Sequence, residues 1–169
     1  MKNGIMILLC ALWAVPLYSH ADASMTMSGN VVASPCTVDT GTVNKTVELG
    51  TIQRRDVQTA GEGGSWTDFD LLVKNCPAGT SKVAATMTGT ADAQDSTAWK
   101  NSGTSSNVAL RITSRDHNTV YAVNSTMQVH VDTSTRSTTF PLSARIFTPE
   151  GSAVAGTFTS VMNVNFTYQ

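Results

Sequence analysis

Apolar and polar residues alternate along most of this chain, and no stretch shows a sustained helical period. The alternating runs span 47–49, 69–73, 83–87, 108–112, 127–131, 140–146 and 162–168. Because successive side chains of a strand point to opposite faces, a period of two indicates strands with one buried face. Turn-forming residues, such as those at 61–64 and 116–118, separate the runs. The pattern predicts an all-β sandwich or barrel.

The first 21 residues have the features of a secretion signal. Lys2 is followed by an apolar run over 5–17 that only Pro16 interrupts, and small residues stand at Ser19 and Ala21. The run is shorter than the ~20 residues that a membrane-spanning helix needs. The sequence therefore predicts a signal peptide at 1–21, cleaved after Ala21 or alternatively after Ala23, and no membrane span in the mature chain.

Cysteine usage adds a second constraint. Of the three cysteines, Cys10 lies in the predicted signal, which leaves Cys36 and Cys76. In an exported chain the default for such a pair is a disulfide, with two free thiols or half of a metal site as the alternatives. A zinc site requires about four close ligands, and no such cluster is present in the sequence. We therefore predict no metal site.

Charge and chemistry exclude several function classes. The 11 basic and 12 acidic residues give no basic face for nucleic acid. His117 falls in a turn and His130 on the polar side of its run, so both are expected to be solvated. The pair Asp68 and Asp70 is expected on the solvated face of an edge strand, and Trp66 and Trp99 are expected to pack in the core or anchor loops. The sequence predicts no catalytic residues, no cofactor and no enzyme activity.

The two ends of the predicted mature chain are unusual. At the N-terminus one face of an alternating run carries Ala23, Met25, Met27, Gly29 and Val31. This run could be an ordinary first strand or a strand that pairs outside its own fold. A glycine inside a strand often marks close approach of another backbone, which favours the second interpretation. At the other end the last run continues to the penultimate residue, which predicts a paired strand at the C-terminus.

Three segments carry a family resemblance: 29–38 (GNVVASPCTV), 75–81 (NCPAGTS) and 165–169 (NFTYQ). A glycine fourteenth from the C-terminus, Gly156, and a penultimate tyrosine, Tyr168, complete the signature. With these features the chain resembles the type 1 fimbrial subunits assembled by the chaperone–usher route, and most closely the minor adaptor pilin of the tip fibrillum. The resemblance covers essentially all of 22–169.

The resemblance implies an incomplete immunoglobulin-like β-sandwich that lacks its final strand, with 22–33 as an N-terminal donor-strand extension and 34–169 as the pilin domain. A periplasmic chaperone would fill the groove left by the missing strand, and a neighbouring subunit's extension would replace it at an outer-membrane usher. The implied donor positions are Ala23, Met25, Met27, Gly29 and Val31. The implied groove and chaperone-binding positions are Gly156, Met162, Val164, Phe166 and Tyr168. The chain would then be secreted through the periplasm to a fimbria on the cell surface.

Two points qualify the resemblance. The extension has methionines where β-branched residues are common in the family, and methionine is unbranched and adaptable, so its fit to a neighbour is expected to be less selective. The alternative function is a sugar-binding fimbrial tip adhesin. Such adhesins need a lectin domain ahead of the pilin domain, and removing 21 of the 169 residues leaves only 148, so this alternative fits poorly. The choice of a tip adaptor over a shaft subunit depends on the resemblance alone.

Overall fold

The computed structural model describes residues 24–30 and 35–169. The chain separates into two units, 1–32 and 33–169. Residues 24–30 form no helix or strand, and the side chains of Met25 and Met27 are exposed. The predicted signal peptide and the predicted donor positions Ala23 and Val31 lie outside the described residues, so the proposed division at 21 and at 33 stays a prediction.

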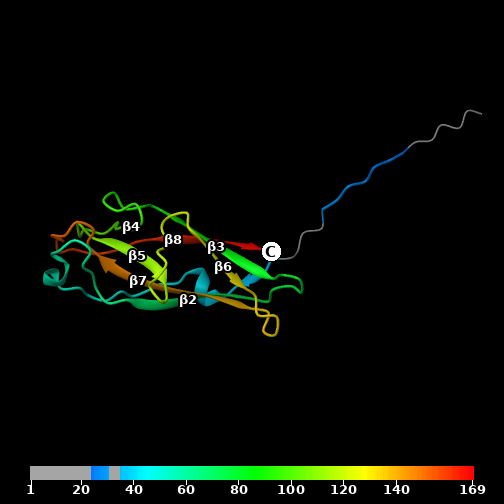
Figure 1. The fold of residues 1–169 in the computed structure, drawn as a ribbon, viewed down its shortest axis with the longest axis horizontal. Helices are drawn as coiled ribbons and strands as arrows, with labels where there is room; N and C mark the ends of the chain where they lie inside the picture. The colour runs from blue at the N-terminus through cyan, green and yellow to red at the C-terminus, as the bar shows by residue number, and fades with distance from the viewer. Residues whose placement is uncertain (1–23, 31–34) are drawn as a thin grey trace, which may run out of the picture. The chain divides into compact units, whose positions relative to one another are not determined.

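The second unit is built from two antiparallel sheets (Figure 1). One sheet has five strands in the order β1-β2-β7-β5-β4, and the other has three in the order β6-β3-β8. The strands are β1 (Thr37–Val38), β2 (Thr67–Lys74), β3 (Lys82–Gly89), β4 (Trp99–Lys100), β5 (Ala109–Ser114), β6 (Thr126–His130), β7 (Thr138–Phe147) and β8 (Met162–Tyr168). Two short helices, α1 (Thr40–Val43) and η1 (Arg54–Val57), precede β2. The predicted all-β fold is confirmed.

The alternation in the sequence places the core between the sheets. In β2 the side chains of Phe69, Leu71 and Val73 are buried, while Asp68 and Asp70 are exposed. The same alternation in the other long strands brings their apolar faces into one cluster, because every second side chain of a strand faces the same way. Buried members of this cluster are Phe69, Leu71, Val73, Val83, Ala85, Met87, Trp99, Leu110, Ile112, Phe140, Leu142 and Ala144.

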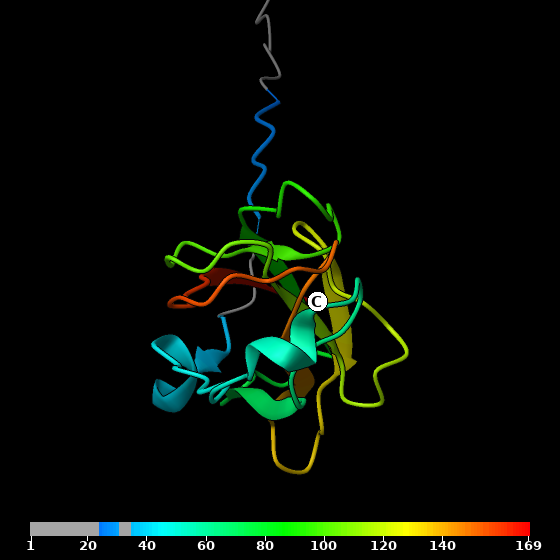
Figure 2. The same ribbon diagram turned by 90° about the vertical axis from the view of Figure 1, so that its left-hand side faces the viewer.

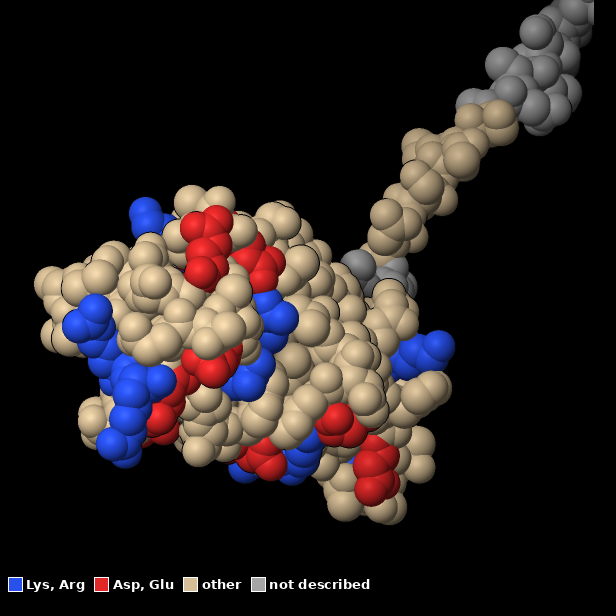
Figure 3. Space-filling model, turned by 60° about the vertical axis from the view of Figure 1, so that its left-hand side comes forward, with Lys and Arg blue, Asp and Glu red and all other residues tan. Residues whose placement is uncertain are grey.

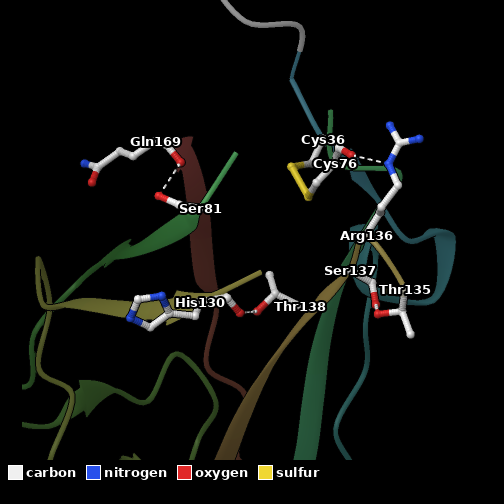
Figure 4. The surroundings of a disulfide bond; sticks show 9 residues. All are labelled: Cys36, Cys76, Ser81, His130, Thr135, Arg136, Ser137, Thr138 and Gln169. Atoms are coloured by element: carbon white, nitrogen blue, oxygen red, sulfur yellow. Dashed lines mark hydrogen bonds between the residues drawn. A yellow bond between two sulfur atoms is a disulfide. The ribbon is translucent and has the colours of Figure 1, made fainter. Parts of the chain in front are cut away.

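The predicted disulfide is present between Cys36 and Cys76 (Figure 4). It joins the start of the domain to the β2–β3 connection, where Arg136 holds the same connection by donating from Nε to the Cys76 carbonyl at 2.8 Å. Close to this bridge, the Gln169 carbonyl accepts hydrogen bonds from the Ser81 amide at 2.6 Å and from Ser81 Oγ at 3.3 Å; the second is drawn in Figure 4. The beginning of the domain and the end of β8 therefore lie at the same end of the sandwich.

One expectation needs correction, and two others can be checked against the structure. The run at 47–49 forms no strand, although Val47 and Leu49 are half-buried against the core. Asp68 and Asp70 are solvated as expected. Beside them, β2 pairs with β7 on one side and with no described strand on the other, because β1 reaches only Val73 and Lys74. Trp99 packs in the core as expected: it is fully buried in β4 and donates from Nε1 to the Tyr121 carbonyl at 2.9 Å. This indole anchors the connection to the core.

Candidate functional site

A groove of about 1330 Å³ runs along one side of the domain. One wall is β8 with the residues that precede it, and the other wall is the segment 42–52, which lies on the same side of the domain (Figure 2). Apolar residues of β2, β5 and β7 form the floor: Phe69, Leu71, Leu110, Ile112, Ala144 and Ile146. The groove therefore opens directly onto the hydrophobic core.

The wall formed by β8 has one apolar face. Met162, Val164 and Phe166 line the groove and are half-buried, and the asparagines between them are exposed. Tyr168 continues the series and packs against the core, and burial raises the pKa of its phenol. Phe166 also contacts Phe140 across the core, with ring centroids 5.5 Å apart. These apolar side chains are only half covered by the chain's own described residues.

The backbone of β8 is paired along one edge only. It pairs with β3, and no strand of the described chain lies on its other side. Lys82 and Gln169 exchange backbone hydrogen bonds at 3.0 and 2.9 Å, and hydrogen-bonded pairs alternate along an antiparallel ladder. The outward N–H and C=O groups therefore belong to Met162, Val164, Phe166 and Tyr168. The residues that present apolar side chains to the groove also present the free backbone groups.

The opposite wall also lacks a backbone partner. Among the described residues, none of the backbone–backbone hydrogen bonds involves 44–52, although Val47, Leu49 and Ile52 pack against the core from this segment. This explains why the run at 47–49 is not a strand: the space beside it holds no chain to pair with. Sequence reasoning missed this wall, and its only signal was an apolar alternation too short to identify as an element.

Gly156 lines the groove just ahead of β8. A Cβ at this position would overlap the backbone of Ser105. The structure therefore gives a packing reason for glycine at this position of the family signature, since only a residue without a side chain lets the two backbones approach so closely. The structure brings Gly156 together with the predicted β8 positions in one wall of the groove.

The predicted donor positions are described only in part. Met25 and Met27 are 79% and 84% exposed, and a Cβ added to Gly29 would meet nothing within 4 Å. Within residues 24–30 these side chains have no packing of their own. Their assignment as donor positions stays a prediction.

Other candidate residues have surface roles. The His117 ring is exposed but stacks on Trp66 with centroids 4.3 Å apart, a contact that the sequence did not predict. Arg115 donates to Asp70 at 2.8 Å and lies 3.5 Å from Asp68. Hydrogen bonds from Ser114 Oγ and from the side chain and backbone of Asn118 lower the pKa of Asp116 to about 2. These contacts tie the loop after β5 to the outer face of the five-stranded sheet.

The described surface is sparsely charged. Basic and acidic side chains are interspersed on the face shown in Figure 3, which is mostly uncharged. Residues 24–30 and 35–169 contain no cluster of three or more potential metal ligands. No helix in this part of the chain is long and apolar enough to cross a bilayer.

Comparison with known proteins gives consistent matches. The family model described as fimbrial protein matches residues 25–169. Protein FimG of Escherichia coli strain K12 is 37% identical over 167 residues, covering 99% of this chain and 97% of FimG. A solved structure of a chaperone–usher pilus has a TM-score of 0.66 at 20% identity, covering 92% of this chain and all of the other. The P pilus rod subunit PapA has a TM-score of 0.64 at 20% identity, covering 80% of this chain and all of PapA.

The structural matches confirm the predicted fold, a pilin-type β-sandwich with one disulfide. The sequence matches extend over almost the whole chain. Members of the matching family are structural subunits of surface fibres, so the predicted location at the cell surface follows from membership. This chain belongs to the fimbrial protein family.

Proposed function

We propose that this chain is a structural adaptor of an adhesive fimbria, completed by a strand from one neighbour and donating its own extension, 22–33, to another. The observation that carries the proposal is the unpaired edge of β8 beside an apolar groove. A strand laid in this groove would meet free backbone groups and apolar side chains on the same four residues of β8. A bound strand would thus gain backbone hydrogen bonds and side-chain burial from the same residues of β8.

The physical need for a partner follows from the same geometry. An unpaired strand edge beside apolar surface is a template for aggregation, and addition of an extended segment to that edge is an established mode of recognition. Large apolar side chains gain ~1.5–3 kcal/mol each when fully buried, and each backbone hydrogen bond contributes a net ~1 kcal/mol. Together such terms are comparable with the ~5–15 kcal/mol stability of a whole domain. The groove is therefore expected to stay filled during assembly, first by a periplasmic chaperone.

The extension has the pattern that such a groove requires. Its apolar residues recur at every second position, so in a strand they would point to one face. Met25 and Met27 are exposed in the free chain, so their burial in a partner would remove apolar surface from water. Gly29 would fit where the partner's wall leaves no room for a side chain. These features support a donor role for Ala23, Met25, Met27, Gly29 and Val31.

The position of the domain's first residues supports an open chain of subunits. The first described residues of the domain, at Cys36, lie at the end of the sandwich where β8 terminates. A donor surface and an acceptor groove on different parts of one molecule make a head-to-tail contact, which does not close on itself and generates a fibre. Transfer from chaperone to neighbour at an outer-membrane usher would give this polymerisation its direction. The similarity to FimG, together with the resemblance to tip adaptors, favours an adaptor position.

The test separates donor and acceptor functions. Deletion of residues 22–32 should leave a folded, chaperone-bound subunit that accepts a neighbour but is not itself incorporated downstream. Phe166→Asp places a charge in the groove, so it should weaken both chaperone binding and capture of a neighbour's strand while leaving the extension intact. Thr167→Asp on the exposed face of the same strand is the matched control and should assemble normally. Normal fibres from the deletion variant, by electron microscopy and immunoblotting of surface fractions, would overturn the proposal.

A further inference from the structure

The groove wall ahead of β8 is held in an unusual way. We call residues 153–160 the rim segment and residues 101–106 the supporting loop. The rim segment lines the groove and leads directly into Met162, but it belongs to neither sheet. Its first residue is fixed by a hydrogen bond from the Ala153 amide to the Val57 carbonyl at 3.2 Å. Beyond that point the described backbone bonds of the rim segment go to the supporting loop.

Three backbone hydrogen bonds join the two segments. The Val154 amide donates to Ser106 at 3.0 Å, the Ser105 amide donates to Thr157 at 3.0 Å, and the Ser102 amide donates to Thr159 at 2.8 Å. Side chains add to them: Ser105 Oγ donates to the Val154 carbonyl at 2.6 Å, and Ser102 Oγ donates to the Thr159 carbonyl at 2.9 Å. The supporting loop thus replaces the strand partner that the rim segment lacks.

Asn101 organises this contact through both atoms of its amide. Its Oδ1 accepts from the Gly103 amide at 2.8 Å and from the Thr159 amide at 2.9 Å. Its Nδ2 donates to the Ser105 carbonyl at 2.8 Å and to the Thr157 carbonyl at 3.4 Å. A side-chain amide has two donor hydrogens and two acceptor sites, so all of its capacity is used, half on the supporting loop and half on the rim segment.

Two glycines make the close approach possible. A Cβ on Gly103 would overlap the backbone of Thr157, and a Cβ on Gly156 would overlap the backbone of Ser105. The segments therefore meet backbone to backbone, with a glycine on each side. Phe158 projects from the rim segment between these contacts and packs against both core clusters at the groove. A shift of the rim segment would move this ring into or out of the space that an added strand would occupy.

We propose that Asn101 is a positioning residue for strand capture, because its amide fixes the rim segment and thereby sets the width of the groove ahead of β8. The inference rests on the proposed function. Asn101 does not itself line the groove, so it acts through the rim segment and not by contact with the donor. Loss of the amide leaves the floor and β8 unchanged and loosens one end of the groove only.

The test measures capture of labelled peptides by the mature chain, supplied as its chaperone complex. The probes are a peptide of residues 22–33 and the corresponding extension of FimG, each also shortened by two residues at either end. Asn101→Ala is expected to slow capture by on the order of tenfold, the equivalent of 1.4 kcal/mol. Asn101→Asp keeps an oxygen that can accept the hydrogen bonds from Gly103 and Thr159, so it should slow capture less than Asn101→Ala. Asn118→Ala, which removes an amide in an exposed turn outside the groove, is the matched control and should have no effect.

The decisive readout is coupling between the variant and the ends of the peptide. Only one end of a bound peptide lies at the rim segment. Shortening that end should slow capture by wild type but add little to the defect of Asn101→Ala. Shortening the opposite end should slow capture by both proteins equally. Equal capture by wild type and Asn101→Ala, or a defect independent of which end is shortened, would overturn the inference and leave the proposed function standing. If wild type captures neither peptide, the proposed function fails and the inference fails with it. Should Asn101→Ala not fold, Asn101→Asp carries the same comparison.

Discussion

The disulfide offers a perturbation whose magnitude can be worked from the structure. Cys36 and Cys76 are 40 residues apart in the sequence, and both side chains are buried. Cross-linking a loop of this length lowers the entropy of the unfolded chain, and the chain-entropy relation gives about 4 kcal/mol at 25 °C. Replacing both cysteines by alanine avoids leaving a free thiol and removes little buried volume. The bridge also ties Cys36 to the β2–β3 connection, so its loss should release the first described residues of the domain.

The assay is equilibrium unfolding in urea of the mature chain, monitored by tryptophan fluorescence. For an m-value of about 2 kcal/mol/M, a loss of about 4 kcal/mol lowers the midpoint by about 2 M. Wild type kept in reductant should unfold at the same concentration as the Cys36→Ala/Cys76→Ala protein, and periplasmic accumulation of the variant should fall. A change in the free energy of unfolding below about 1 kcal/mol would refute the reasoning, because it would show that the unfolded chain gains almost no freedom when the bridge is removed.

Two further predictions concern the core and the outer loop. Trp99→Phe should lower the free energy of unfolding by about 2 kcal/mol or more, because it leaves the Tyr121 carbonyl without its donor and opens a cavity; a loss below about 0.5 kcal/mol in urea unfolding would contradict this. The pKa of Asp116 should be about 2 by NMR titration, held there by Ser114 and Asn118. Because this pKa is lowered on folding, its contribution to stability is present above the unfolded value of ~3.9 and lost as the pH falls through about 2. A measured value near ~3.9 in the folded chain would contradict the hydrogen-bond assignment.

The long strands could be predicted because their signal is local. The alternation of apolar residues such as Phe69, Leu71 and Val73 indicates which face of the strand is buried, whatever the partner strand is. The disulfide between Cys36 and Cys76 was also predictable, because an exported chain with two remaining cysteines is expected to pair them. The free edge of β8 had no such local signal, since an edge is defined by the absence of a neighbour in space and the sequence of β8 resembles that of any other half-buried strand. Only the family resemblance implied it.

The segment at 47–49 and the short strand β4 show the limits of local sequence pattern. Val47 and Leu49 alternate like strand residues, but a strand requires a backbone partner, and the groove stands where that partner would be. Trp99 lies among polar residues in the sequence, yet it is fully buried. Its indole packs in the core and donates a hydrogen bond to the Tyr121 carbonyl. The role of Asn101 depends on four backbone groups up to 58 residues away, which no local window contains.

The measurement that tests the central claim most directly is residue-resolved amide hydrogen exchange of β8 with and without a donor peptide. In the free chain the amides of Asn163, Asn165 and Thr167, which face β3, should be protected, while those of Met162, Val164, Phe166 and Tyr168 should exchange quickly. Addition of the peptide should protect this second set and leave the first set protected. Uniform protection in the free chain, or no change at the four outward amides when peptide is bound, would contradict the account that β8 is an edge awaiting a strand.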